Sequence, residues 1–219
     1  MLPTRELETS HGHPESLVAG IDEVGLAPLA GPVVACAIVM PPGETIDDVR
    51  DSKALSRRQR ERLEPIIRRA ALAYGIGAAS AREIERLNPR AASHLAMARA
   101  LAALQRRYRI AVALSLVDGS PAQDLDSLIG PHRTVVRGDA SVYPIACASI
   151  VAKVLRDRLM ERLAVRYPGY GWETNAGYPA AAHVAALMRL GVTPHHRRSY
   201  APVKDAVRER GGELRSSNA

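Results

Sequence analysis

Apolar and polar positions along the chain form two kinds of segment: short apolar runs, and longer stretches with helical spacing. The short runs are bounded by Gly, Pro or polar residues, which is typical of buried strands. The longer stretches repeat apolar residues every three or four positions, which predicts helices with one apolar side. We expect strands at residues 17–24, 31–40, 72–79, 111–117 and 134–137, and helices at 56–70, 89–108, 144–166 and 179–190.

This order of elements predicts the fold class. Strands come first, then helices and strands alternate, and helices close the chain, which favours an α/β domain with a central mixed β-sheet flanked by helices. The last helices form a small C-terminal helical extension. Residues 1–16 are polar, and we predict a flexible N-terminal arm there. We expect a single domain over residues 17–205 and a flexible, polar tail over residues 206–219.

Composition narrows the class of partner. The 219 residues are 47% hydrophobic, enough for one sizeable core, and the formal net charge is +7. A positive chain indicates an anionic partner, with nucleic acid first and a membrane surface second. An Arg-rich surface that serves solubility is the alternative interpretation.

Cysteine usage and hydropathy indicate the compartment. Cys36 and Cys147 lie in apolar segments, and no Cys/His spacing is typical of a zinc site. We expect two buried, reduced thiols. No signal peptide is evident, and no apolar run has the length of a membrane span. We therefore expect a cytoplasmic protein, a monomer, with no membrane contact.

Two adjacent acids interrupt the first apolar run. Asp22 and Glu23 lie within residues 17–24, where a buried carboxylate must neutralise, pair or bind a cation. Because neighbouring strand residues point to opposite faces, both could reach one ion only at a bend near Val24-Gly25 or at a strand edge. A surface turn that begins with Asp-Glu is the alternative.

Two further acids share this character. Asp118 follows the apolar run 111–117, and Asp139 precedes the helix at 144–166. Sites in α/β sheets lie at the ends of central strands. Four carboxylates without His or Cys favour Mg²⁺ or Mn²⁺, and with an anionic substrate they favour two-metal phosphoryl chemistry. A turn at Asp118-Gly119 is the structural alternative.

The amino-acid sequences of several motifs resemble those of the bacterial ribonuclease HII family over roughly residues 17–203. The motifs occur in order and without large gaps. They are Gly20-Ile21-Asp22-Glu23, Pro28-Leu29-Ala30-Gly31-Pro32, Asp51-Ser52-Lys53-Ala54-Leu55, Val117-Asp118-Gly119, Gly138-Asp139-Ala140, Ser149-Ile150-Val151-Ala152-Lys153-Val154-Leu155-Arg156-Asp157, Gly177-Tyr178-Pro179 and His196-Arg197-Arg198-Ser199-Tyr200.

The resemblance implies a ribonuclease H-like fold and a metal-dependent endonuclease. Such an enzyme hydrolyses the RNA strand of RNA–DNA hybrids, or cuts 5′ of a ribonucleotide embedded in duplex DNA, and leaves 3′-hydroxyl and 5′-phosphate ends. The family's four metal-binding carboxylates match Asp22, Glu23, Asp118 and Asp139. Two divalent ions, Mg²⁺ or Mn²⁺, are expected with the substrate.

The resemblance also implies substrate-binding residues. Lys53 matches a lysine near the substrate phosphate, and Tyr178 matches a tyrosine that packs on the sugar next to the ribonucleotide. Lys153, Arg156 and Arg158 could contact the nucleic acid backbone, but we favour pairing with Asp157 on the polar side of the helix. His195 and His196 look like a metal pair, and the family context makes a structural role the better interpretation.

The chain departs from the family on the elements expected to bind substrate. Where relatives carry Gly-Arg-Gly next to the ribose, this chain has Gly25-Leu26-Ala27, and Ala176 replaces a Lys before Gly177. Loss of one phosphate contact lowers the salt dependence of binding by about one unit. If residue 27 needs positive φ, alanine adds roughly 1–2 kcal/mol of strain.

Two hypotheses from different classes follow. The first is a ribonucleotide-directed endonuclease that keeps metal binding but discriminates ribonucleotides differently or more weakly. The second is a nucleic-acid-binding protein on the same fold that cuts poorly or not at all. Metal-dependent cleavage that disappears in Asp118→Asn distinguishes the two. A third hypothesis, a structured DNA junction as substrate, is disfavoured because a sugar-sensing Tyr178 would have no use there.

Overall fold

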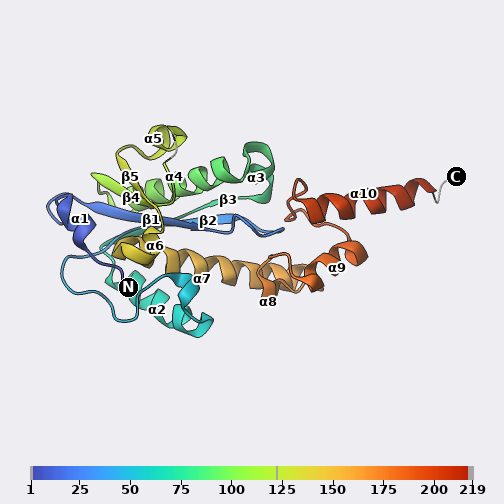
Figure 1. Cartoon of the computed structure of the whole chain (residues 1–219), viewed down its shortest axis with the longest axis horizontal. Coiled ribbons are helices and arrows are strands. Elements are labelled where there is room, and N and C mark those ends of the chain that lie inside the picture. Colours follow the sequence, from blue (N-terminus) through green and yellow to red (C-terminus); the bar gives the residue numbers. More distant parts are fainter. Residues whose placement is uncertain (1, 122, 217–219) are drawn as a thin grey trace. The chain divides into compact units, whose positions relative to one another are not determined.

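The computed structural model describes residues 2–121 and 123–216, and these residues form two compact units (Figure 1). Unit 1 comprises the described parts of Met1–Val24, Val34–Ala78 and Ser93–Leu155. Unit 2 comprises the described parts of Gly25–Val33, Ala79–Ala92 and Arg156–Ala219. A single domain over residues 17–205 stays a prediction.

Unit 1 contains the sheet and the helices around it. Its whole elements are α1 (Glu6–Ser10), β1 (Val18–Val24), the 3₁₀ helix η1 (Ser52–Ala54), α2 (Arg57–Ala70), β4 (Leu114–Asp118), α5 (Gln123–Ile129), β5 (His132–Val135) and α6 (Gly138–Ser141). It also contains the larger parts of β2 (Val33–Val39), β3 (Ala73–Ala79), α4 (Pro89–Tyr108) and α7 (Tyr143–Arg166). Unit 2 contains α3 (Ala81–Leu87), α8 (Trp172–Asn175), α9 (Ala181–Leu190) and α10 (Ala201–Ser216).

The sheet has five strands in the order β3-β2-β1-β4-β5. Strand β1 pairs antiparallel with β2 and parallel with β4, and β4 pairs parallel with β5. The predicted mixed sheet is therefore confirmed, and β1 lies at its centre.

Glycines let helices approach the strands closely. A Cβ on Gly75 or Gly77 of β3 would collide with the backbone of α4, and a Cβ on Gly20 of β1 would collide with the first turn of α7. In Figure 1, α4 covers one face of the sheet, and α7 and α2 lie on the other. The strands β1 and β2 are consequently buried on both faces over most of their length, which explains why they have nearly continuous apolar sequences.

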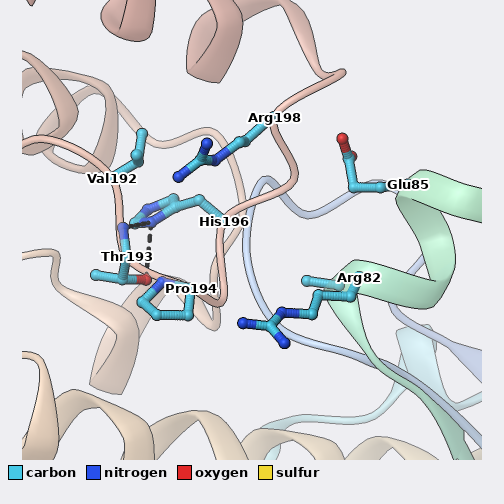
Figure 2. A pocket seen from close by; sticks show the side chains of 8 residues that line it. Arg82, Glu85, Val192, Thr193, Pro194, His196 and Arg198 are labelled. Atoms are coloured by element: carbon cyan, nitrogen blue, oxygen red, sulfur yellow. Dashed lines mark hydrogen bonds between the residues drawn. The ribbon is translucent and has the colours of Figure 1, made fainter.

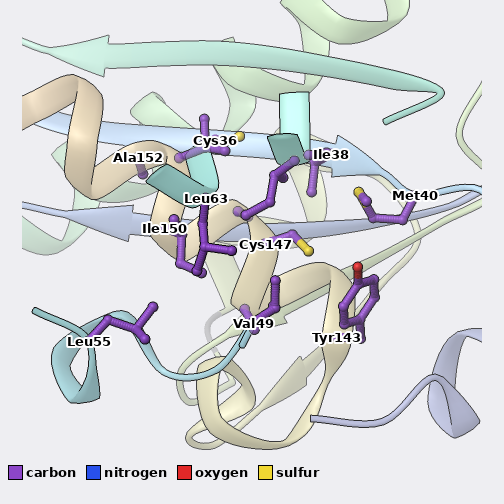
Figure 3. Packing of buried hydrophobic residues seen from close by; sticks show 14 residues of the cluster. Cys36, Ile38, Met40, Val49, Leu55, Leu63, Tyr143, Cys147, Ile150 and Ala152 are labelled. Carbon is purple, nitrogen blue, oxygen red and sulfur yellow. The ribbon is translucent and has the colours of Figure 1, made fainter. Parts of the chain in front are cut away.

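The larger core of unit 1 lies between the sheet, α2 and α7. Cys36 and Ile38 from β2 pack with Leu63 from α2 and with Cys147 and Ile150 from α7 (Figure 3). Both cysteines are buried and free, as predicted. Ser56 caps α2 by accepting the N–H of Gln59, which confirms the helix start expected there.

The N-terminal segment differs from the predicted flexible arm. Residues Glu6–Ser10 form α1, and the N–H of Thr4 donates to the Ser141 carbonyl at 3.0 Å. The Arg5 guanidinium lies 4.2 Å from the ring centroid of Tyr143 and donates to buried Glu8 at 2.7 Å. In this polar segment, charged side chains are thus paired with one another and with an aromatic ring.

The C-terminal segment also differs from the prediction. A polar tail was expected after residue 205, but α10 continues to Ser216, and Val203 and Ala206 are buried beside α9 residues in the core of unit 2. That core also contains Leu29, Met160, Tyr170 and Trp172. Flexibility of residues 206–219 stays a prediction.

Within residues 2–121 and 123–216, none of the helices combines the length and the hydropathy that a membrane span needs.

We predict that Gly77→Ala destabilises the protein by about 2–4 kcal/mol, because the added Cβ would meet the carbonyl of Ala96 and the N–H of Ala100 in α4. Urea unfolding measures the loss. Ala78→Val is the matched control, since Ala78 is the next residue of β3 and its side chain is exposed. Equal stability of the two variants would contradict the close packing of α4 on β3.

Candidate active site

Asp22 and Glu23 lie near the end of the central strand, beyond its contact with β4. The β1–β4 ladder ends at the pair Ile21↔Val117, whereas the β1–β2 ladder continues regularly through Asp22↔Cys36 and Glu23↔Ala35. The strand edge therefore opens where the acids begin, and no bulge is present in the β1–β2 register. The regular β1–β2 register ends at the pair Val24↔Val34, and Gly25 follows it with a positive φ of +102°.

Asp118 is the last residue of β4 and lies level with Asp22 across the sheet, because the preceding residues are paired in register. Its Oδ1 accepts the N–H of Gly138 at 2.7 Å and the N–H of Asp139 at 3.3 Å. These bonds fold the start of α6 over the end of β4. Asp139 is thereby brought beside Asp118, although the two are far apart in sequence.

Lys53 approaches the same group of acids from η1. The Asp51 carboxylate caps η1 by accepting the N–H of Lys53 at 2.9 Å. The Lys53 Nζ donates to Asp139 Oδ2 at 2.8 Å, while most of the lysine side chain is exposed. The cation therefore reaches the acids from the solvent side and remains accessible to a ligand.

Burial and mutual repulsion govern the protonation of these acids. Burial, reinforced by the charges of Glu23 and Asp118, raises the pKa of Asp22 well above its usual range. Burial and the charge of Asp118 raise the pKa of Glu23 to about 7. Burial and the charge of Asp139 raise the pKa of Asp118, although two backbone N–H donors oppose the shift. The hydrogen bond to Asp139 raises the pKa of Lys53.

The chemistry of this group fits a divalent cation. All its donors are carboxylate oxygens, which Mg²⁺ and Mn²⁺ prefer. Glu23 Oε2 is buried without a hydrogen-bond partner among the described residues, and such an atom is costly unless a ligand completes it. In the described part of the chain, however, no three His, Cys, Asp or Glu side chains are placed so that they could hold a metal ion together. Metal ligation by Asp22, Glu23, Asp118 and Asp139 stays a prediction.

The residues expected to recognise the sugar belong to unit 2. Gly25, Leu26 and Ala27 begin the segment after β1, and Tyr178 follows α8 in a partly exposed turn. Gly25 has φ +102°, and a Cβ there would meet the side chain of Arg156. Ala27 does not have a left-handed backbone, so the strain that we considered for it is absent; Ala176 has one, with φ +48°.

Arg156 corrects one expectation. It does not lie on a polar helix side: its side chain is fully buried, and it donates to the carbonyls of Ala30, Pro32 and Ala176. The carbonyls come from segments far away in sequence, which helical periodicity does not reveal.

The histidines of unit 2 form a buried network with Trp172. The indole N–H donates to His183 Nε2 at 3.0 Å, and His196 Nε2 lies 3.1 Å from the same atom. The N–H of Thr193 donates to His196 Nδ1 at 2.9 Å. Burial lowers the pKa of His196 to about 3, so it is neutral at physiological pH. These contacts are what a structural role for His196 requires.

A separate pocket of about 440 Å³ lies within unit 2 (Figure 2). It contains none of the residues singled out for catalysis or substrate binding. Its lining comes from α3 and the loop after α9: Ala81, Arg82, Glu85, Val192, Thr193, Pro194, His196 and Arg198.

Comparison with known proteins identifies the family. The family profile described as Ribonuclease HII matches residues 19–203. The chain belongs to the ribonuclease HII family. A Ribonuclease HII from Paracoccus denitrificans is 52% identical over 187 residues, which are 85% of each chain.

Solved structures agree with this assignment at the level of the fold. Ribonuclease H2 from Pyrococcus horikoshii superposes with a TM-score of 0.71 at 27% identity, over 86% of this chain and 96% of that one. Bst-RNase HIII in complex with Mn²⁺ has a TM-score of 0.73 at 19% identity, over 90% and 71% of the two chains. The ribonuclease H-like fold is thus confirmed. This ribonuclease HII is a type 2 ribonuclease H, an endonuclease for RNA–DNA hybrids.

The acids of this ribonuclease HII make its metal-free stability depend on pH. Because the pKa of Glu23 is about 7 in the folded protein and ordinarily 4.5, the folded state holds this proton more tightly than the unfolded state. Its stabilising contribution is complete below about pH 4.5 and is lost as pH rises to 7. We predict that the free energy of unfolding of the wild type falls by about 1–3 kcal/mol as the pH rises because Glu23 loses its proton, and that Glu23→Gln does not show this fall.

Urea unfolding in EDTA at pH 5 and 7.5 measures this decline. Asp126→Asn is the control, because Asp126 is an exposed acid of unit 1 outside the group. Glu8, whose pKa burial also raises to about 7, contributes equally to all three proteins. Parallel pH profiles for wild type and Glu23→Gln would contradict the prediction.

Proposed function

We propose that this ribonuclease HII is a metal-dependent endonuclease that cuts 5′ of ribonucleotides embedded in duplex DNA, in addition to hydrolysing the RNA strand of hybrids. It leaves 3′-hydroxyl and 5′-phosphate ends. One observation carries the proposal: Asp22, Glu23 and Asp118 lie at the ends of two neighbouring parallel strands with Asp139 of α6 beside them, and burial and mutual repulsion raise the pKa of the first three. Only a bound cation makes such a group favourable in its ionised form.

Asp22, Glu23, Asp118 and Asp139 would hold two divalent ions. Bst-RNase HIII, which shares the fold, was solved with Mn²⁺, and we carry divalent-metal dependence, with Mg²⁺ or Mn²⁺, to this chain as a proposal. When bound, such ions lower the pKa of water and stabilise a leaving oxygen.

The chain itself supplies rigidity and charge. Asp118 is held by two backbone N–H groups, so its oxygens keep their direction when the substrate arrives. Lys53 places an exposed ammonium next to Asp139. A compact ammonium of this kind would bind a phosphate oxygen of the cleaved strand and so orient it toward the acids.

The sugar would be recognised by unit 2. We propose that the segment Gly25-Leu26-Ala27 contacts the ribose and that Tyr178, whose ring is partly exposed, packs on the neighbouring sugar. Leu26 supplies no cation, so we expect the salt dependence of binding to be lower by about one unit than with arginine there. We propose that the protein acts as a monomer in the cytoplasm.

We predict cutting only at the 5′ side of a single ribonucleotide in a DNA duplex, and none in the all-DNA duplex, with Mg²⁺ or Mn²⁺. Asp118→Asn should reduce the rate by at least about 10³-fold, because it removes a ligand charge. Asp22→Asn should behave alike while duplex binding stays within about twofold, since no cationic contact is lost. Gel assays of cleavage and fluorescence anisotropy of binding measure these quantities.

Asp126→Asn is the matched control and should cut like wild type, because this acid lies outside the group. No cutting with either metal, despite measurable duplex binding, would favour the hypothesis of a nucleic-acid-binding protein. Binding that falls as much as cleavage in Asp22→Asn would overturn the division between acids and cations.

A further inference from the structure

A segment near the N-terminus packs on the connection that follows Asp139, although it lies outside the part of the chain that matches the family profile. The profile begins at residue 19. Residues 3–13, which we call the N-terminal strap, contain α1 and belong to unit 1, as do the four acids. Pro3, Glu8 and His13 of the strap are buried. The strap is therefore packed against unit 1, and the family match does not account for it.

Helix α6, which carries Asp139, is too short to be stable by itself. It has four residues, and the entropy cost of ordering a single turn exceeds what its few hydrogen bonds contribute. Its start is fixed by the Asp118 carboxylate, which accepts the N–H groups of Gly138 and Asp139. The end of the helix needs a second anchor if the position of Asp139 is to be well defined.

The strap supplies this anchor through the backbone of Thr4. The N–H of Thr4 donates to the carbonyl of Ser141, the last residue of α6, at 3.0 Å. The Thr4 carbonyl accepts the N–H of Tyr143 at 2.9 Å, so that Thr4 and Val142 form a parallel bridge. Leu7 adds an apolar contact, because it packs against the core cluster that contains Val142. The connection between α6 and α7 is thus held by the strap.

Arg5 ties the same connection to the segment that leads to Lys53. Its guanidinium lies 4.2 Å from the ring centroid of Tyr143, and its Nη2 donates to the carbonyl of Glu44 at 3.2 Å. The Tyr143 hydroxyl accepts the N–H of Ile46 at 2.8 Å. This segment continues to η1, the helix that carries Lys53. The strap therefore contacts the segments that lead to η1 and away from α6, the two elements joined by the ion pair of Lys53.

We propose that Thr4 and Arg5 are positioning residues that hold the turn carrying Asp139 in place beside Asp118, so that the four acids bind a divalent ion with less rearrangement. The inference rests on the proposed function, because it concerns the same acids. Without a cation, their charges repel and favour separation of the turn from the strand end. The strap opposes this separation. Coupling between two sites is reciprocal, so a bound ion must also strengthen the docking of the strap.

Thr4→Pro tests the anchor directly, because proline removes the N–H that donates to Ser141. We expect Mn²⁺ binding, measured by electron paramagnetic resonance of the free ion, to weaken at least about fivefold. At a Mn²⁺ concentration near the wild-type Kd, kcat for a ribonucleotide-containing duplex should fall, while KM for the duplex stays within about twofold of wild type, because the strap acts on the metal-binding acids and not on the duplex.

Thr4→Val is the matched control, because the side chain of Thr4 is exposed and valine keeps the N–H. It should bind Mn²⁺ and cut like wild type. Gly77→Ala controls for stability, because it disturbs the packing of β3 on α4 and leaves the strap unchanged. Although less stable, it should bind Mn²⁺ within about twofold of wild type, since destabilisation of the fold alone does not alter an assembled site.

Equal Mn²⁺ affinity of Thr4→Pro and Thr4→Val would overturn the inference and leave the proposed function intact. An equal loss of affinity in Thr4→Pro and Gly77→Ala would also overturn it, because the strap would then serve stability alone. Absence of saturable Mn²⁺ binding or of cleavage by wild type would instead overturn the proposed function.

A second measurement uses wild-type protein and does not depend on how the variants fold. Because the coupling is reciprocal, Mg²⁺ should slow hydrogen exchange at the amides of Thr4 and Tyr143 by at least about fivefold. The amide of Ser199 in unit 2, which donates to the Glu85 carboxylate, is the internal control and should not change. Exchange at Thr4 and Tyr143 that is the same with and without saturating Mg²⁺ would refute the coupling.

Discussion

The crowding of four carboxylates at one end of the sheet is the interaction on which the account of this protein depends. Parallel pairing of β1 with β4 places Asp22 and Asp118 side by side, and the N–H groups of Gly138 and Asp139 then bring Asp139 to Asp118. The fold gains nothing from this arrangement when the acids are alone, because their charges repel in a buried place. Under the proposed function, a bound divalent cation would turn this repulsion into attraction.

Unit 2 contains buried cations where unit 1 contains buried anions. Arg156 and Arg197 are buried cations, and backbone carbonyls take the place of counter-ions. A guanidinium suits this task because its several N–H donors lie in one plane and can bind carbonyls of separate segments. The same bonds that satisfy the charge also fix the orientation of peptides in the segment Gly25–Val33.

Much of the candidate site could be predicted from the sequence, because buried acids stand out against apolar strands. Asp22, Glu23 and Asp118 were selected in this way, and Asp139 for its place before a long helix; the structure has the first three at neighbouring strand ends and Asp139 in α6 beside Asp118. The division into two units and helix α1 were not predicted. The roles of Arg156 and Arg197 were missed because their partners are backbone carbonyls. Every residue has a carbonyl, so the sequence does not show which ones accept these hydrogen bonds. An arginine within a helical sequence is predicted to be exposed unless its hydrogen-bond acceptors are known.

The proposed function requires that the four acids bind divalent cations. Electron paramagnetic resonance of Mn²⁺ titrated into the wild-type protein tests it directly, because bound Mn²⁺ loses the signal of the free ion. We expect saturable loss of the free-ion signal, reversal by excess Mg²⁺, and at least tenfold weaker binding when Asp22 and Asp118 are both replaced by asparagine. Free-ion signal that follows added Mn²⁺ without saturation, or equal binding by the double variant, would contradict it.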